Sequence, residues 1–222
     1  MRRCEYRQLG RIGYPQAWEL QRRLVERRKA GEIPDQLLLL EHPHVITLGR
    51  NAQPENIVAG EDALREAGVE VCETDRGGDV TYHGPGQLIG YPILDLGGWK
   101  RDVAAYVDAL EETIIGALAE FGVAARREPG MRGVWTGNGK IAAIGVHISR
   151  WVTSHGFALN VNTDLDYFRF IVPCGLTRPV TSMQREGAKA DPAAVASAVV
   201  RHFGRVFECE MVLGEELEEM AS

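Results

Sequence analysis

The chain has 222 residues, of which 45% are hydrophobic and 25% charged, and its formal net charge at pH 7 is −6. This is the balance of an ordinary folded protein with enough residues to bury a core, and the net charge argues against wholesale nucleic-acid binding. No apolar run approaches the ~20 residues that cross a bilayer, and no apolar segment follows the basic residues near Met1, so we expect one cytoplasmic domain over residues 1–222 without a secretory signal.

The first half of the chain predicts short elements that alternate between helix and strand. Pro15 suits the first turn of a helix that runs to about Ala30. Leu37–Leu40 and Val45–Leu48 are predicted as buried strands with a turn between them. A short helix over 62–67 is followed by a strand over 69–74.

The second half contains the longest helical pattern, from Asp102 to Phe121. Its apolar residues recur at steps of three and four and predict one buried face, namely Val103, Val107, Leu110, Ile114, Ala117, Leu118 and Phe121. Strands are expected over 123–127, 134–136, 141–148 and 157–162, and Asp191-Pro192 opens a last helix through about Phe207. Strands cluster instead of alternating strictly with helices, so we predict an α+β fold with a mixed or largely antiparallel sheet and flanking helices.

The segment Arg76–Gln87, RGGDVTYHGPGQ, concentrates four glycines and a proline. Glycine permits positive φ and close approach of a ligand. A tight hairpin at Gly77-Gly78 would explain the glycines, but it would not explain the adjoining Arg76 and His83. We therefore favour a ligand-binding loop over a simple turn.

A second segment, Gly137–Ala142, superficially matches a dinucleotide-binding fingerprint. That motif needs a helix after it, whereas the residues from Ala143 to Ile148 predict a strand. A phosphate-binding loop also fails, because Val134 stands where glycine is required and Ile141 follows the lysine. What remains is a turn that places Lys140 at the start of a strand.

The third segment, Phe170–Leu176, contains a cysteine between Pro173 and Gly175. Cys72 and Cys209 are predicted as small buried side chains, and Cys4 gives no signal. Cys174 differs because an irregular, accessible loop suits a reactive thiol, provided that a nearby cation favours the thiolate. The candidates for that cation are Lys140, His83, His147 and His155.

The histidines do not form a metal-binding pattern. His42-Pro43-His44 is too tightly spaced for usual zinc sites, and neither an H-E-x-x-H motif nor a paired Cys/His cluster occurs. The G-x-S-x-G elbow of a serine hydrolase is also absent from the sequence. We expect neither a metal nor a cofactor, and either His147 or His155 could be a structural histidine.

Taken together, the chemical segments resemble the lipoyl(octanoyl) transferase family, the octanoyl-[acyl-carrier-protein]:protein N-octanoyltransferases. The matching runs follow the family's order and spacing, and they are Arg76–Gln87, Gly139–Ile148, Ser154–Asn162 and Ile171–Leu176, with looser similarity at His42–Arg50. The resemblance implies a fold like the catalytic domains of biotin and lipoate protein ligases. It also implies protein lipoylation, in which acyl carrier protein donates an octanoyl group to a lysine of a lipoyl domain or of the glycine-cleavage H protein.

The resemblance also implies the site residues. By matching position, Cys174 carries the acyl group as a thioester and Lys140 is its catalytic partner. The residues implied to line the acyl site are Arg76, Gly77, Gly78, Asp79, Val80, Thr81, Tyr82 and His83, together with Ala143, Ile144, Gly145, Gly156, Phe157 and Ala158. No ATP is needed, because exchange between thioesters is nearly isoenergetic.

An acidic carrier protein would dock on a local basic face. The candidate faces are Arg22–Lys29, Arg126-Arg127, Arg150 and Arg169. Three other functions remain open from the sequence: an ATP-dependent lipoate or biotin ligase, a non-catalytic acyl- or carrier-binding module, and a thioesterase that releases the acyl group to water.

Overall fold

The computed structural model describes residues 1–172 and 178–215, so Cys174 lies outside the described residues. The strands within those ranges are β1 (Arg2–Arg11), β2 (Asp35–Glu41), β3 (Val45–Leu48), β4 (Glu70–Glu73), β5 (Val80–His83), β6 (Gln87–Ile93), β7 (Arg126–Glu128), β8 (Met131–Trp135), β9 (Lys140–Ser149), β10 (Val152–Asn160) and β11 (Cys209–Leu213). The helices are α1 (Tyr14–Lys29), α2 (Glu61–Glu66), α3 (Val103–Ala119) and α4 (Pro192–Val206), with short 3₁₀ turns η1 (Pro54–Asn56), η2 (Leu96–Gly98) and η3 (Leu165–Phe170).

The strands form two sheets. The larger has eight strands in the order β11-β1-β2-β6-β10-β9-β8-β7, and the smaller has three in the order β4-β3-β5. In the large sheet, β1 runs parallel to both β11 and β2. The remaining neighbours, from β2-β6 to β8-β7, are antiparallel. The predicted α+β fold with a mixed sheet is therefore confirmed.

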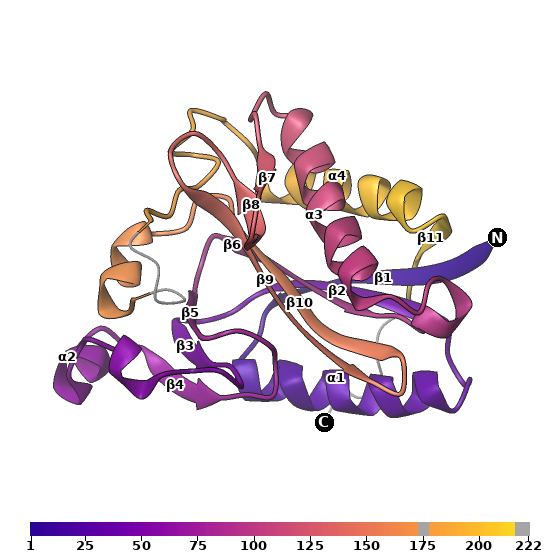
Figure 1. The fold of residues 1–222 in the computed structure, drawn as a ribbon, viewed down its shortest axis with the longest axis horizontal. Coiled ribbons are helices and arrows are strands. Elements are labelled where there is room, and N and C mark those ends of the chain that lie inside the picture. Colours follow the sequence, from indigo (N-terminus) through magenta and orange to yellow (C-terminus); the bar gives the residue numbers. More distant parts are fainter. Residues whose placement is uncertain (173–177, 216–222) are drawn as a thin grey trace.

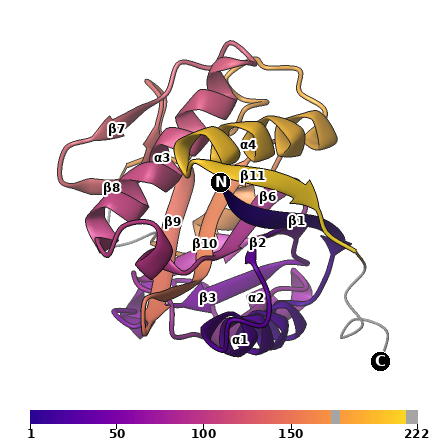
Figure 2. The same ribbon diagram turned by 90° about the vertical axis from the view of Figure 1, so that its right-hand side faces the viewer.

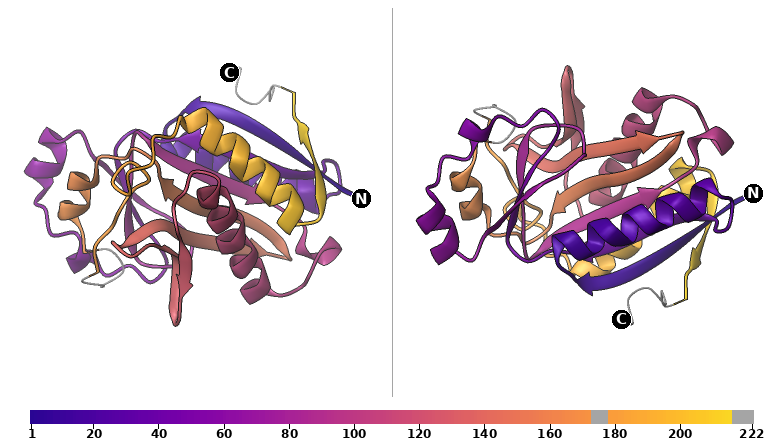
Figure 3. Two further views of the ribbon diagram at one scale, coloured as in Figure 1. Left: turned by 90° about the horizontal axis from the view of Figure 1, so that it is seen from above. Right: turned by 90° about the horizontal axis from the view of Figure 1, so that it is seen from below.

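Helices cover both faces of the large sheet (Figure 1, Figure 2). α3 and α4 lie side by side on one face and α1 lies along the other, as the views from above and below show (Figure 3). Successive strand residues point to opposite faces. Leu37 and Leu39 of β2 thus pack in the core under α3 and α4, and Leu38 and Leu40 pack against α1. The uninterrupted run of four leucines is the pattern of a strand that is covered on both sides.

The small sheet has its own core with α2 and η3, built around Ile46, Leu64, Val80 and Tyr82. β5 belongs to this sheet and β6 to the large one. The glycine-rich segment therefore carries the chain from one sheet to the other. This crossing brings Arg76 and His83 next to the strands of the large sheet.

Most predicted elements are found within one or two residues of their expected ends. Asp102 and Asp191 cap their helices by accepting from the backbone N–H groups of Ala105 and Ala194. The apolar face of α3 was wrong at one position, because Val103 in its first turn is 47% exposed. Cys72, predicted as buried, is only half-buried on the outer strand β4.

Four strands were not predicted: β1, β5, β6 and β11. β1 carries several charged residues, which ion pairs keep on the sheet, such as Arg2 with Asp35 at 2.6 Å. β7 is also shorter than the strand expected over 123–127, since it begins at Arg126. Periodicity missed β1 because ion pairs hold its charged residues on the sheet, whereas β6 is buried at every residue and shows no alternation of polar and apolar side chains.

Candidate active site

A cavity of about 430 Å³ lies between the glycine-rich turn, β9 and β10, within the size range of small-molecule sites. Many predicted site residues line it: Arg76, Gly77, Gly78, Thr81, His83, Lys140, Ala143, Ile144, Gly145, Gly156, Phe157 and Ala158. The other lining residues, which were not predicted for this role, are Tyr14, Tyr91, Val107, Gly130, Met131, Arg132, Val146 and His155. Of these, only His155 was singled out in the sequence, as a candidate cation.

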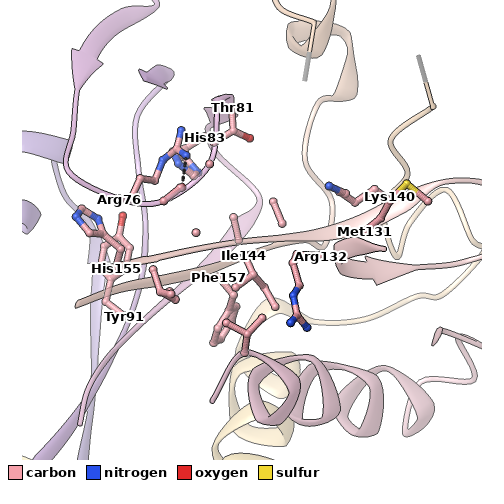
Figure 4. A pocket seen from close by; sticks show the side chains of 18 of the residues that line it. Arg76, Thr81, His83, Tyr91, Met131, Arg132, Lys140, Ile144, His155 and Phe157 are labelled. Carbon is pink, nitrogen blue, oxygen red and sulfur yellow. Dashed lines mark hydrogen bonds between the residues drawn. The ribbon is translucent and has the colours of Figure 1, made fainter. Parts of the chain in front are cut away.

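The cavity has two distinct ends (Figure 4). Arg76, His83, Tyr91 and His155 gather toward one end, and Met131, Arg132 and Lys140 toward the other, with Ile144 and Phe157 between them. Lys140 begins β9, and Val146 of the same strand pairs with His155. Lys140 and Val146 are six residues apart along β9, which corresponds to roughly 20 Å along the sheet.

Three predicted lining residues lie away from the cavity wall. Val80 and Tyr82 point into the core of the small sheet. Asp79 instead holds a neighbouring turn: its carboxylate accepts from the backbone N–H of Gln53 at 3.0 Å and from Asn56 Nδ2 at 2.6 Å. The structure therefore gives Asp79 bonds that fix the position of the η1 turn.

Arg76 organises the buried end. Its Nε and Nη2 donate to Thr47 Oγ1 at 3.1 and 2.9 Å, and Nη2 also donates to the carbonyls of Thr47 and Asp79. Thr47 Oγ1 accepts hydrogen bonds from the guanidinium and donates its own proton to His83 Nε2, at 3.3 Å. His83 Nδ1–H then donates to Gln87 Oε1 at 2.8 Å.

Burial lowers the pKa of His83 well below its usual range, in agreement with a neutral ring that accepts at one nitrogen and donates at the other. The chain of hydrogen bonds continues from Gln87 Nε2 to Asn160 Oδ1 at 2.8 Å, and from Asn160 Nδ2 to the carbonyl of Thr181 at 3.0 Å. The N–H of Thr181 bonds to the carbonyl of Lys140 at 2.9 Å. One polar network thus reaches from Arg76 to the backbone of Lys140.

Two further histidines support the buried end from behind. His42 Nδ1–H donates to the carbonyl of Ile12, and its Nε2 accepts from the hydroxyl of Tyr91, each at 2.8 Å. Burial lowers the pKa of His42 to about 4. His155 Nε2 lies 2.7 Å from Asp75 Oδ1, and this hydrogen bond lowers the pKa of Asp75 to about 2.

The Asp75 carboxylate favours a protonated His155, but burial outweighs it and lowers the pKa of His155. We therefore assign a neutral ring, with Nε2–H donating to Asp75 and Nδ1 facing the Tyr14 hydroxyl at 3.4 Å. The buried end accordingly presents several neutral rings, and its polar atoms are occupied by one another.

The opposite end carries positive charge. Lys140 Nζ lies 4.8 Å from the centre of the Trp135 ring, and the Arg178 guanidinium lies 5.7 Å from the same ring, within the range of cation–π attraction. The N–H of Lys140 donates to the carbonyl of Pro179 at 3.0 Å. Gly139, at φ +150°, permits this contact, because a side chain there would collide with Pro179.

Glycine also allows the loop to lie on the sheet. The N–H of Gly77 donates to the carbonyl of Val146 at 2.9 Å, and a Cβ on Gly145 would stand only 2.8 Å from the Gly77 oxygen. Backbone thus packs directly on backbone at the cavity wall.

The described cysteines are separate from this cavity. Cys4 and Cys209 lie in the core, and Cys72 is in the small sheet. Within residues 1–172 and 178–215, no helix is long and apolar enough to cross a membrane. The same residues contain no group of three or more His, Cys, Asp or Glu side chains placed to hold a metal ion.

The fold defines the class of protein. Residues 13–204 match the lipoyl protein ligase A/B catalytic domain. The bi-partite lipoate protein ligase of Thermoplasma acidophilum superposes with a TM-score of 0.81 at 16% identity, over 100% of this chain and 90% of that one. The biotin protein ligase of Aquifex aeolicus gives 0.55 at 12% identity, over 94% and 71% of the two chains. The chain therefore has the lipoate and biotin ligase catalytic fold expected from its motifs.

Sequence relatives narrow this class. The chain is 62% identical to the octanoyltransferase of Solibacter usitatus over 98% of its own length and 99% of the relative's. It is 53% identical to that of Koribacter versatilis, over 96% and 87% of the two chains. The chain belongs to the octanoyltransferase family and is an acyltransferase.

Proposed function

We propose that the protein transfers an octanoyl group from octanoyl-acyl carrier protein to the target lysine of lipoyl domains and of the glycine-cleavage H protein. The reaction would be the first step of endogenous protein lipoylation in the cytoplasm, where a reducing environment keeps the thiol of Cys174 free. The single observation that supports this most strongly is the cavity of the octanoyltransferase-like chain, with Lys140 at one end and an apolar passage beyond it.

In this proposal the thioester lies at the Lys140 end and the aliphatic tail extends toward the buried end. Ala143, Ile144, Phe157 and Ala158 offer the apolar walls that a hydrocarbon chain requires. Lys140 and Arg178 supply positive charge near the reacting carbonyl. Preorganised positive charge stabilises a thiolate and the oxyanion that forms on the carbonyl.

The chemistry consists of two exchanges at the same carbonyl carbon. The Cys174 thiolate attacks the carrier thioester, a new C–S bond forms, the bond to the phosphopantetheine sulfur breaks, and that sulfur leaves with a proton from the Lys140 ammonium. The amine of the acceptor lysine then attacks the acyl-cysteine, a C–N bond forms, and the Cys174 sulfur leaves. Lys140, neutral after the first exchange, accepts the proton that the attacking amine loses and regains its charge.

The test is intact-mass measurement after incubation with octanoyl-acyl carrier protein in the absence of ATP. Wild type should gain a hydroxylamine-labile octanoyl group that disappears when apo-lipoyl domain is added. Cys174→Ala should gain none, and Lys140→Ala should transfer roughly 10²- to 10⁴-fold more slowly, the usual effect of removing a general acid–base group.

Lys100→Ala is the matched control, because Lys100 also lies over a tryptophan, 5.1 Å from the Trp99 ring, but does not line the cavity. Acceptor modification that requires ATP and free octanoate would instead indicate a ligase. Release of octanoate at the same rate with and without acceptor would indicate a thioesterase. Binding of the donor without any turnover would leave only a binding module.

A further inference from the structure

The buried end of the cavity backs onto a second depression. A groove of about 720 Å³ lies along α1, and its lining includes Trp18, Gln21, Lys29, Asp75 and His147. The cavity and the groove have no lining residue in common. His155 lines the cavity, whereas Asp75, to which it is hydrogen-bonded at 2.7 Å, lines the groove. The imidazole therefore stands between the two spaces.

His155 is held in this position from several sides. Only 1% of its surface is exposed, and its backbone N–H donates to Gln21 Oε1 of α1 at 2.7 Å. Its φ is +54°, a left-handed conformation that histidine adopts more readily than most residues but that still carries strain. Tertiary contacts with α1 and Asp75 thus fix a strained residue at the end of the cavity.

We propose that His155 sets the longest acyl chain that the cavity can hold, because its ring stands at the far end of the cavity, roughly 20 Å along the sheet from Lys140, where a chain of about sixteen carbons would end. This inference rests on the proposed function, with the thioester at the Lys140 end. A longer tail would have to displace an imidazole that is bonded to Asp75 and to enter a groove lined with charged residues. An alkyl group cannot replace the lost hydrogen bond, so the ring limits the chain more firmly than an apolar side chain would.

The test uses two substitutions that suit the backbone. His155→Gly removes the ring and relieves the positive φ, and His155→Asn shortens the side chain while keeping a residue that tolerates this conformation. Equal mixtures of acyl-carrier proteins with chains from six to sixteen carbons are offered with apo-lipoyl domain, and the products are counted by intact mass. The ratio of hexadecanoyl to octanoyl transfer should rise ~10-fold or more in the glycine variant, since pocket shape discriminates chain length at about this level per group.

His147→Ala is the control for general disturbance of the groove. His147 also contacts Asp75, with Nδ1 3.4 Å from Oδ2, but it lines only the groove. Its product distribution should match wild type. Added imidazole, which can refill the space in His155→Gly, should move the distribution back toward octanoyl.

The outcomes separate the two proposals. Wild type that transfers octanoyl, together with a glycine and an asparagine variant that keep the wild-type chain-length distribution, would overturn the role of His155 and leave the proposed function standing. Wild type that transfers no acyl group from any carrier protein would overturn the proposed function itself. Because only ratios among products are compared, a general loss of activity in a variant does not obscure the result.

Discussion

The two ends of the cavity differ in how their polar and charged side chains are arranged. At the buried end, Thr47, His83 and Tyr91 satisfy polar neighbours inside the protein, and burial keeps the His83 ring neutral. At the other end, Lys140 and Arg178 lie within cation–π range of Trp135, and the Arg132 side chain is 56% exposed. The buried end therefore has a fixed shape, and the Lys140 end supplies positive charge.

This difference shows where binding and chemistry can each occur. The polar atoms of the buried end are already hydrogen-bonded to one another and do not need polar partners from a ligand. The buried end can therefore accept an aliphatic tail without leaving polar groups unsatisfied. Arg76 is the charged exception, and it donates to the oxygens of Thr47, Gly77 and Asp79. The Lys140 end, in contrast, offers cations to a developing negative charge.

The most damaging change we expect is Gly145→Ala, which forces the buried end away from the sheet. The new Cβ would stand 2.8 Å from the Gly77 oxygen and 3.3 Å from Arg76 Cδ. Overpacking of this kind costs up to about 3 kcal/mol, because backbone rather than a flexible side chain must move. Urea unfolding should report the loss, and the transfer assay should report the displaced Arg76.

Gly98→Ala is the matched control, since a Cβ on Gly98 meets no atom within 4 Å. Equal effects of the two substitutions on stability and on transfer would show that the contact between the loop and the sheet is not what matters.

A second prediction concerns the neutrality of the buried end. The pKa of His42 falls from 6.5 to about 4 because the ring is buried. Between these values the unfolded chain binds a proton that the folded protein does not. The stabilisation is therefore complete above about pH 6.5 and is lost as the pH falls toward about 4, by roughly 2 kcal/mol near pH 5.

The measurement is the free energy of unfolding near pH 7.5 and near pH 5 for wild type and for His42→Gln. Glutamine can still donate to the Ile12 carbonyl and accept from Tyr91, but it does not titrate. The variant should lose less stability on acidification than wild type. An identical loss in both proteins would assign the pH dependence to other groups. Asp75 does not interfere, because its lowered pKa affects stability only below about pH 4.

The sequence revealed the parts of this molecule that depend on local chemistry. Glycine-rich turns, helix caps and apolar periodicity are local signals, so α1, α3 and α4 and the loop that contains Arg76 were predictable. The implied residues on β9 and β10, such as Ile144 and Phe157, do line one cavity. The strand predicted after Lys140 is also present as β9.

Long-range placement could not be predicted in the same way. Tyr14 is the first residue of an ordinary amphipathic helix and Tyr91 lies in a strand with no polar signal, yet tertiary packing brings both to the cavity. Asp79 lies within the glycine-rich motif, but its carboxylate turns toward Asn56. Sequence proximity to a site did not distinguish a lining residue from one that supports a neighbouring turn.

The smallest effect we expect concerns the surface on which the proposed carrier-protein donor would dock. Among the basic residues that could form a docking surface, those of β7 and β8 lie near the Lys140 end of the cavity. Arg22, in contrast, lies beside the groove on α1. Arg132 lines the cavity and is 56% exposed, and its 2.6 Å ion pair with Asp108 is a surface pair of small energetic value. Arg132→Glu should therefore raise the KM for octanoyl-acyl carrier protein several-fold, most strongly at low salt.

Arg22→Glu is the control, because Arg22 is similarly exposed, at 70%, and similarly paired, with Glu19 at 3.5 Å. In the proposed reaction the carrier thioester arrives at the Lys140 end, so reversal of charge on α1 should leave KM unchanged. Steady-state kinetics at two salt concentrations measure both variants. A larger increase in KM for Arg22→Glu than for Arg132→Glu would place the carrier protein on the opposite face, and the acyl group would then have to enter from the end that His155 closes.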